Sequence, residues 1–135
     1  MSRLLLDTGI FIEAERTRGT IGHAIGDEDD VAIAAITAAE LLVGVERAVA
    51  SRRDRRASFV EDVLANVPVE DYGVDIARAH ARLLAYTSAA GTPRGAHDLI
   101  IAATAVATDR EVVTHDVKAA FDTLPDVRCR VIPRP

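Results

Sequence analysis

Short apolar runs recur along the chain, and each is long enough for one buried strand. Runs of this length, without alternation of apolar and polar positions, are typical of strands that are covered on both faces. The pattern therefore predicts four to five short strands in a buried sheet. The candidates are residues 4–6, 31–36, 67–69, 111–114 and 130–132.

Between these runs, apolar residues recur at helical spacing. Thr37 and Glu40 have the spacing of a capping box, so the sequence predicts a helix that starts at Thr37. A second amphipathic helix should end before Pro68 and a third before Gly91. Residues 99–107 are apolar on almost all sides, which predicts a buried helix. Strands that alternate with helices indicate an α/β fold, with a parallel sheet, right-handed crossovers and helices on both faces.

The composition is that of one ordinary globular domain, residues 1–135. The chain is 49% hydrophobic and 27% charged, a balance that argues against disorder. Its single cysteine, Cys129, allows neither an intrachain disulfide nor a thiolate metal cluster. The first apolar run is too short for a signal peptide, and no apolar stretch approaches the roughly 20 residues that span a bilayer. We therefore expect a cytoplasmic protein without a membrane segment.

Four carboxylates fall at corresponding ends of the predicted elements. Asp7 follows the first strand, and Asp116 follows the strand at residues 111–114. Glu40 is expected in the first turn of the helix after the second strand, and Asp98 lies near the start of the buried helix. The carboxyl ends of parallel strands share one edge of the sheet, where α/β proteins bind ligands. We therefore expect these four side chains to converge.

A cluster of carboxylates favours a bound metal ion. Like charges repel one another, and burying several without compensation is costly. Mg²⁺ and Mn²⁺ prefer oxygen ligands and keep several waters, which suits phosphodiester hydrolysis because the metal acidifies water and neutralises charge on the phosphate. The sequence thus predicts a Mg²⁺ or Mn²⁺ site. Each acid alone has a simpler explanation, as a favourable charge at a helix N-terminus or as a turn residue.

These residues also resemble the successive motifs of a known family, the PIN-domain nucleases, and within it the VapC-type toxins of bacterial toxin–antitoxin pairs. The resemblance implies a three-layer α/β/α sandwich with a central, mainly parallel sheet, and a Mg²⁺- or Mn²⁺-dependent endoribonuclease that cleaves RNA. It also implies a homodimer and inhibition by a VapB-type antitoxin. The matching segments are Leu5-Leu6-Asp7-Thr8, residues 37–44, residues 97–103 and Val113-Thr114-His115-Asp116, followed by Phe121.

The resemblance assigns roles by motif position. Asp7, Glu40, Asp98 and Asp116 take the catalytic, metal-binding positions. Thr8 and Thr114 take positions from which a hydroxyl would orient a carboxylate or a metal-bound water.

The net charge of −5 has the wrong sign for a protein that binds RNA mainly by neutralising phosphates. A phosphate substrate therefore needs local positive charge, from a cation or from arginines. One arginine cluster is a candidate for contact with RNA or antitoxin, although its members would also suit the C-terminus of a helix. It comprises Arg47, Arg52, Arg53, Arg55 and Arg56. Arg94, Arg110 and Lys118, near the expected edge, are weaker candidates.

Other functions were weighed against this one. His97 and His115 each precede a proposed site acid and are alternative general bases, whereas His80, on an apolar stripe, is expected to be packed. A haloacid-dehalogenase-type phosphatase needs a second Asp two residues after Asp7, where Gly9 stands. A phosphoacceptor receiver domain needs an acidic pair after the first strand. The remaining alternative is a catalytically silent PIN-like module that binds a partner protein.

Overall fold

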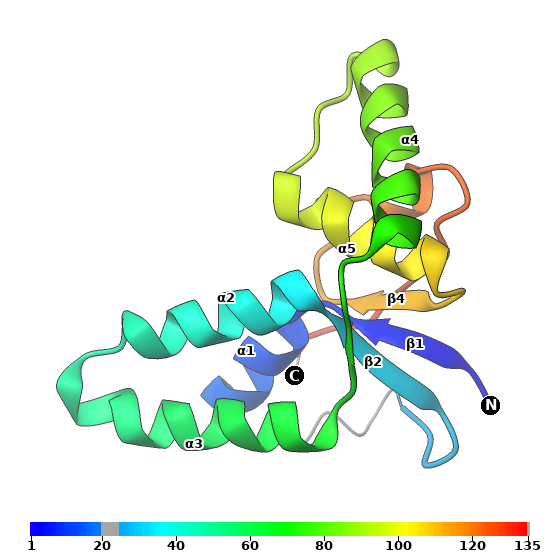
Figure 1. The fold of residues 1–135 in the computed structure, drawn as a ribbon. Helices are drawn as coiled ribbons and strands as arrows, with labels where there is room; N and C mark the ends of the chain where they lie inside the picture. Colours follow the sequence, from blue (N-terminus) through cyan, green and yellow to red (C-terminus); the bar gives the residue numbers. More distant parts are fainter. Residues whose placement is uncertain (20–24, 135) are drawn as a thin grey trace.

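The central element of the fold is a parallel five-stranded sheet in the order β3-β2-β1-β4-β5 (Figure 1). This computed structural model describes residues 1–19 and 25–134. The sheet confirms the prediction of four to five short parallel strands. Its strands are β1 (Arg3–Leu6), β2 (Asp30–Ala34), β3 (Val69–Glu70), β4 (Glu111–Thr114) and β5 (Cys129–Val131).

Helices cover both faces of the sheet, which confirms the three-layer α/β/α arrangement (Figure 1). Residues of α4 and α5 pack on one face against Leu5, Ala32 and Val112. Residues of α1, α2 and α3 pack on the other face with Leu6 and Val113. The helices are α1 (Thr8–Thr17), α2 (Ala35–Glu46), α3 (Ala50–Asn66), α4 (Val74–Ala90) and α5 (Ala96–Ala107), with a 3-10 turn, η1 (Phe121–Thr123).

The strand order places a topological switch between β1 and β4. From β1 the chain moves outward through β2 to β3, and it then returns to place β4 on the other side of β1. Helix α1, which follows β1, packs on one face of the sheet, and α5, which precedes β4, packs on the other. Ligands of open α/β sheets bind at such a switch point.

The start of α2 differs from the prediction. Strand β2 ends at Ala34 and passes directly into α2 at Ala35, so Ile36 is helical and Thr37 does not cap the helix. Thr37 is fully buried, and Glu40 lies in the second turn of α2 instead of the first. No side chain caps this helix, because the chain needs no loop between the strand and the helix.

Other boundaries follow the sequence more closely. Helix α3 ends at Asn66 before Pro68, and α4 ends at Gly91, whose φ of 67° is the left-handed conformation common after helices. The third strand is shifted to Val69–Glu70, because proline lacks the N–H that a ladder needs. Helix α1 was not predicted. Within the described ranges, no helix has the length and apolar character needed to cross a bilayer.

Candidate active site at the strand ends

The four predicted acids lie on different elements around the switch point. Asp7 follows β1 and is the N-cap of α1, and Asp116 comes two residues after β4. Glu40 projects from α2, and Asp98 lies in the first turn of α5. Electrostatic repulsion links them, because the charges of Glu40 and Asp116 raise the pKa of Asp7, and the other three acids raise that of Asp98. The fold thus brings all four to one edge.

Asp7 is the most enclosed of these acids, with only 8% of its surface exposed. Its Oδ1 accepts a hydrogen bond from the Thr8 backbone N–H at 2.8 Å, and its Oδ2 accepts one from the Thr114 hydroxyl at 2.7 Å. Burial raises the pKa of Asp7 more than any other cause, and these hydrogen bonds lower it. The carboxylate is therefore held in one orientation by two donors while its charge is poorly solvated.

Two threonines connect the acids to one another. The Thr8 hydroxyl lies 2.9 Å from Oε1 of Glu40, to which it donates, and 3.1 Å from the Thr37 hydroxyl. The Thr114 hydroxyl donates to Asp7 and accepts the backbone N–H of Asp116 at 2.9 Å. Thr8 therefore joins Asp7 to Glu40, and Thr114 joins Asp7 to the segment that carries Asp116. The buried hydroxyl of Thr37, which sequence reasoning did not select, completes this network.

The Asp98 carboxylate lies close to Gly95, the residue that precedes α5. A Cβ placed on Gly95, the N-cap of α5, would lie 3.3 Å from Oδ2 of Asp98. Burial is the main cause of the raised pKa of Asp98, and repulsion by the other acids adds to it. Asp98 accepts no hydrogen bond from another side chain of the described residues. Its position depends on the start of α5 and on the absence of a side chain at Gly95.

Asp116 is more exposed and also serves as a turn residue. Its Oδ1 accepts backbone N–H groups from Lys118 at 2.9 Å and Ala119 at 3.2 Å. One carboxylate oxygen is thus used to hold the loop after β4, as the simpler explanation expected. The Asp116 carboxylate is nevertheless close enough to act on Asp7 and Asp98.

These groups suit a hard divalent cation. All four are carboxylates, the ligands that Mg²⁺ and Mn²⁺ prefer, and the poorly solvated Asp7 gains most from a nearby positive charge. Among residues 1–19 and 25–134, no three acidic, His or Cys side chains are already gathered as closely as a complete ligand set. An ion that keeps several waters needs few direct protein ligands.

The predicted arginine cluster divides into separate groups. Arg53 donates to the carbonyl oxygens of Glu46 and Ala48, where α2 ends. Arg47 is the C-cap of α2. Arg52, Arg55 and Arg56 instead line a cavity between α1 and α3, which no sequence pattern had indicated.

Most of the weaker candidates have structural partners. Arg110 was expected near the active edge, but it precedes β4, is buried, and pairs with Asp30 and Glu70. Arg94 donates to the carbonyl oxygens of Ala119 and Ala120, which anchors the loop after Asp116. Lys118 is exposed, beside Asp116.

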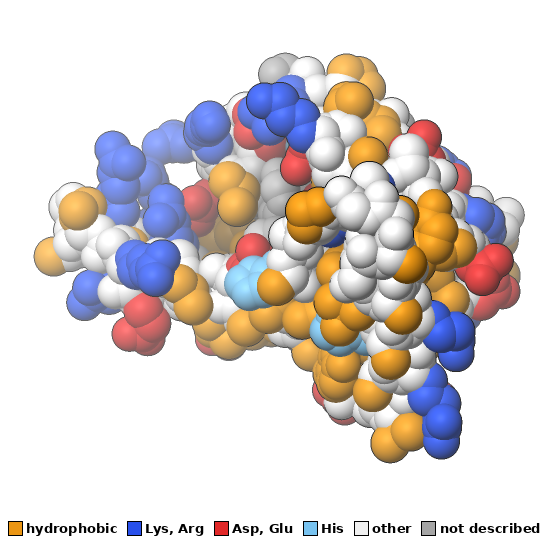
Figure 2. Space-filling model, turned by 90° about the horizontal axis from the view of Figure 1, so that it is seen from above, with side chains coloured by type: hydrophobic (Ala, Val, Ile, Leu, Met, Phe, Trp, Pro, Cys, Tyr) orange, Lys and Arg blue, Asp and Glu red, His pale blue; other side chains and the backbone are white. Residues whose placement is uncertain are grey.

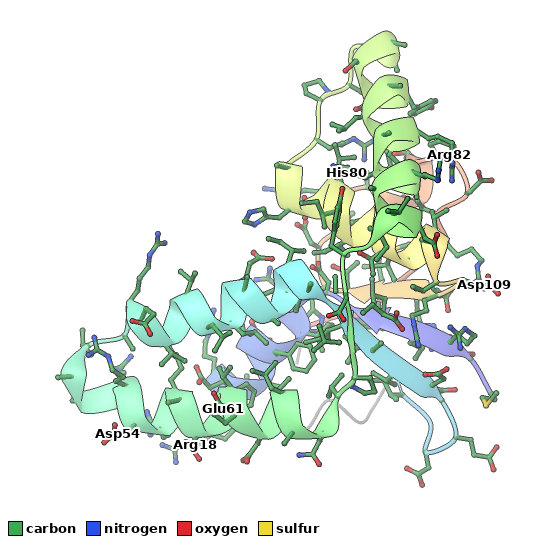
Figure 3. All side chains as sticks on the ribbon, in the orientation of Figure 1. Arg18, Asp54, Glu61, His80, Arg82 and Asp109 are labelled. Atoms are coloured by element: carbon green, nitrogen blue, oxygen red, sulfur yellow. The ribbon has the colours of Figure 1, made fainter. Side chains whose placement is uncertain are left out.

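The histidines also differ in their surroundings. Nδ1 of His115 lies 2.9 Å from the carbonyl oxygen of Ile132, a backbone contact away from the acids. His80, labelled in Figure 3, is half-buried. Its Nδ1 lies 2.8 Å from the hydroxyl of the exposed Tyr72, so the histidine has a partner, as expected, but it is not packed in the core. Of the three histidines that the structure describes, His97 alone forms a contact with a site acid, with Nδ1 at 3.5 Å from Oε2 of Glu40.

Comparison with known proteins agrees with this geometry. A family model described as PIN domain matches residues 4–125. Ribonuclease VapC5 of Mycobacterium tuberculosis is 36% identical over 83% of this chain and 82% of its own length. The tRNA(fMet)-specific endonuclease VapC of Salmonella typhimurium is 31% identical over 71% of this chain and 70% of its own length. The chain therefore belongs to the PIN-domain family and, within it, to the VapC ribonucleases.

A solved structure supports the same placement. The M. tuberculosis VapBC-5 structure, from the VapBC family of toxin–antitoxin systems, matches with a TM-score of 0.80 and 30% identity. The match covers 98% of this chain and 100% of that one. The agreement spans the whole sheet and the helices on both of its faces.

Proposed function

We propose that this chain is a metal-dependent endoribonuclease whose acids Asp7, Glu40, Asp98 and Asp116 bind Mg²⁺ or Mn²⁺. One observation carries the proposal. A carboxylate that is 8% exposed, Asp7, shares the strand-end edge with three more carboxylates, and no arginine or lysine of the described residues forms an ion pair with any of them. Such uncompensated charge at a ligand-binding edge is typical of a cation site.

The residues around the acids have positioning roles in this proposal. The Thr8 N–H and the Thr114 hydroxyl fix the orientation of Asp7, and the Thr8 hydroxyl does the same for Glu40. A bound divalent ion would supply Lewis acidity, which acidifies water and offsets negative charge on the scissile phosphate. His97, more than half exposed, lies beside Glu40 and is placed to restrain that carboxylate. A strong protein base is therefore not required.

The proposal also includes the partners that similar proteins suggest. Relatives named as ribonucleases, one of them specific for tRNA(fMet), make RNA the substrate class. The similar VapBC structure makes a VapB-type antitoxin the expected protein partner. A homodimer remains part of the proposal, and assembly state can be measured by light scattering.

Cleavage of labelled RNA with Mn²⁺ tests the metal site. Wild-type protein should cleave, and excess chelator should stop it. Asp7→Asn should reduce the rate by more than about a hundredfold, because asparagine keeps the oxygen that caps the helix but loses the charge and presents an NH₂ group to the Thr114 hydroxyl. Asp27→Asn is the charge-matched control: Asp27 is exposed in the loop before β2, at the opposite end of the strands, and should cleave like wild type.

Two results would reject the metal site. Cleavage that persists in chelator would show that no bound ion is needed, and full activity of Asp7→Asn would remove the central ligand. A wild-type protein that binds an antitoxin but never cleaves RNA under any divalent ion would instead support the catalytically silent module.

A further inference from the structure

A second charged region lies beside the acidic edge and has the opposite sign. Helices α1 and α3 enclose a cavity of about 880 Å³. Among the described residues its charged lining consists of five arginines and one glutamate, Arg16, Arg18, Arg52, Arg55, Arg56 and Glu15. We call it the arginine cavity. Figure 2 shows basic side chains gathered at the end of the molecule where α2 and α3 project. In a chain of net charge −5, this concentration is local.

The geometry of α3 explains why these arginines face the same way. Arg52, Arg55, Arg56 and Phe59 stand at positions i, i+3, i+4 and i+7, so they share one side of the helix. Arg53, out of this phase, turns to the end of α2. The cavity lining is thus one helical face opposed to the end of α1.

Two of the cavity arginines are already used within the protein. Arg56 pairs with Glu15 at 3.1 Å, and Arg16 approaches Glu13 at 3.9 Å. Arg18, Arg52 and Arg55 are exposed and form no side-chain hydrogen bond or ion pair with the described residues. Three guanidinium groups therefore face a concave surface with their donors available. Guanidinium presents a planar set of donors that matches phosphate oxygens.

A second pocket lies between the arginine cavity and Glu40 of the active edge. This smaller slot, of about 160 Å³, is lined mainly by apolar side chains and has Glu40 in its lining. It shares Ile12, Glu15, Arg56 and Phe59 with the arginine cavity. The length of α1 gives the distance between the acidic edge and the arginine cavity. The helix begins beside Asp7 and its C-cap is Arg18, so the two regions lie about 15 Å apart along the helix.

We propose that the arginine cavity binds backbone phosphates of the RNA substrate, a few nucleotides from the bond that is cleaved. This inference rests on the proposed function. An acidic edge repels a polyanion wherever no cation is bound, so the substrate needs an anchor of positive charge within reach of the same strand. The slot has Glu40 in its lining and shares four residues with the cavity, so an RNA strand that extends from the acidic edge across α1 would place phosphates against Arg18, Arg52 and Arg55. An acidic peptide is the competing ligand.

RNA binding measured without metal tests the proposal. The probe is a fluorescent single-stranded RNA of about 15 nucleotides, followed by anisotropy in chelator over a series of salt concentrations. Arg52→Gln/Arg55→Gln is compared with Arg78→Gln/Arg82→Gln. The control changes the net charge equally but alters exposed arginines of α4, far from α3 (Figure 3).

The two double glutamine variants should differ in RNA affinity and in its salt dependence. Loss of two phosphate contacts should lower the slope of log K against log salt by about 1.4 and weaken binding roughly tenfold at low salt. The α4 control should stay within about twofold of wild type. Arg52→Lys/Arg55→Lys, which keeps the charge, should restore the slope. Matching melting curves would show that the variants are folded, as expected for arginines without partners among the described residues.

Equal binding by the two glutamine variants would overturn the proposal. Unchanged RNA binding together with weaker binding of an antitoxin peptide by Arg52→Gln/Arg55→Gln would overturn it in favour of a protein ligand. Because the measurement contains chelator, it does not depend on catalysis. If wild type fails to cleave RNA with Mn²⁺, the proposed function fails while the comparison of the arginine variants still stands.

Discussion

Charged side chains lie against the sheet at Arg110 and around Asp7, and the two regions differ in whether the protein itself neutralises the charge. At Arg110, a guanidinium whose side chain is 5% exposed lies between Asp30 and Glu70, and it also donates to the carbonyl oxygens of Leu4 and Asp30. At the strand ends near Asp7, four carboxylates share one edge without an arginine or lysine partner among the described residues.

The difference separates a structural role from a functional one. The charge of Arg110 is neutralised inside the protein, where its two terminal nitrogens bind the starts of β1 and β2 together. Its Nε has no hydrogen-bond partner among the described residues, but it is buried and therefore not accessible to a ligand. The charges around Asp7 are aligned by neutral donors, Thr8 and Thr114, which orient them without cancelling them. An external cation is the group that would complete this second arrangement.

The largest expected effect comes from Asp98→Asn. Cleavage with Mn²⁺ should fall by more than about a hundredfold, since a proposed ligand is lost. The metal-free protein should become more stable, with a melting temperature raised by roughly 1–3 °C in chelator at neutral pH. Mn²⁺ should stabilise wild type more than the variant, because an ion that binds only the folded state stabilises it more when it binds more tightly.

The pH dependence of that stability follows from the pKa. Burial and the neighbouring acids raise the pKa of Asp98 in the folded chain above its value of about 3.9 when unfolded. Its protonated form therefore favours folding below the unfolded pKa, and this contribution is lost as pH rises through the folded pKa. The higher melting temperature of Asp98→Asn relative to wild type should appear at neutral pH and vanish in acid. An equal advantage at both would contradict the electrostatic explanation.

Arg110→Met should give the next largest effect. It leaves two carboxylates and two carbonyl oxygens without their cation, and the free energy of unfolding should fall by about 2–3 kcal/mol. The loss is below that of a fully buried pair because Asp30 is 39% exposed and Glu70 31%. Arg128→Met breaks the exposed pair with Asp109 and should cost less than about 0.5 kcal/mol. Denaturant unfolding measures both, and equal losses would show that burial at Arg110 is unimportant.

Gly95→Ala should give the smallest effect, and it tests how exactly Asp98 is placed. The new methyl would meet Oδ2 of Asp98 at 3.3 Å, so the carboxylate must shift by a few tenths of an ångström. Cleavage should fall roughly threefold to tenfold while the melting temperature barely changes. Gly73→Ala is the matched control, since Gly73 also begins a helix and its Cβ would meet nothing within 4 Å. Equal rates in both variants would show that Asp98 tolerates displacement.

The sequence predicted the buried sheet well because continuous apolar runs such as Leu4–Leu6 have few alternatives in a chain of this size. Helix α1 was missed because Thr8-Gly9-Ile10-Phe11-Ile12 combines a glycine with β-branched and aromatic residues, which favour helices weakly. Its N-cap, Asp7, was interpreted as the residue that ends the first strand and as a site ligand, not as the start of a helix. The first half of α3 is rich in arginine, and its apolar residues do not recur at helical spacing. The sequence therefore predicted only the second half of α3 as a helix.

The candidate site was predictable as a set of positions but not as a network. Because Asp7 and Asp116 each follow a predicted strand, the sequence predicted that they lie at the same edge of the sheet. The structure places them at one edge. The contacts of Thr8 with Glu40 and of His97 with Glu40 join helices that are distant in sequence, so no local spacing reveals them. The arginine cavity has the same origin, because it depends on how α1 packs beside α3.

Asp7 both starts α1 and stands in the active edge, and this double position restricts how the protein can change over generations. Asparagine, serine and threonine also begin helices well, whereas alanine and valine do not. Chains that lose activity at position 7 yet remain folded should therefore carry asparagine, serine or threonine there, and asparagine is the closest to aspartate in shape. Such a chain would keep the surface that a protein partner recognises, so a single amide in place of a carboxylate would convert an enzyme into a decoy for its own inhibitor.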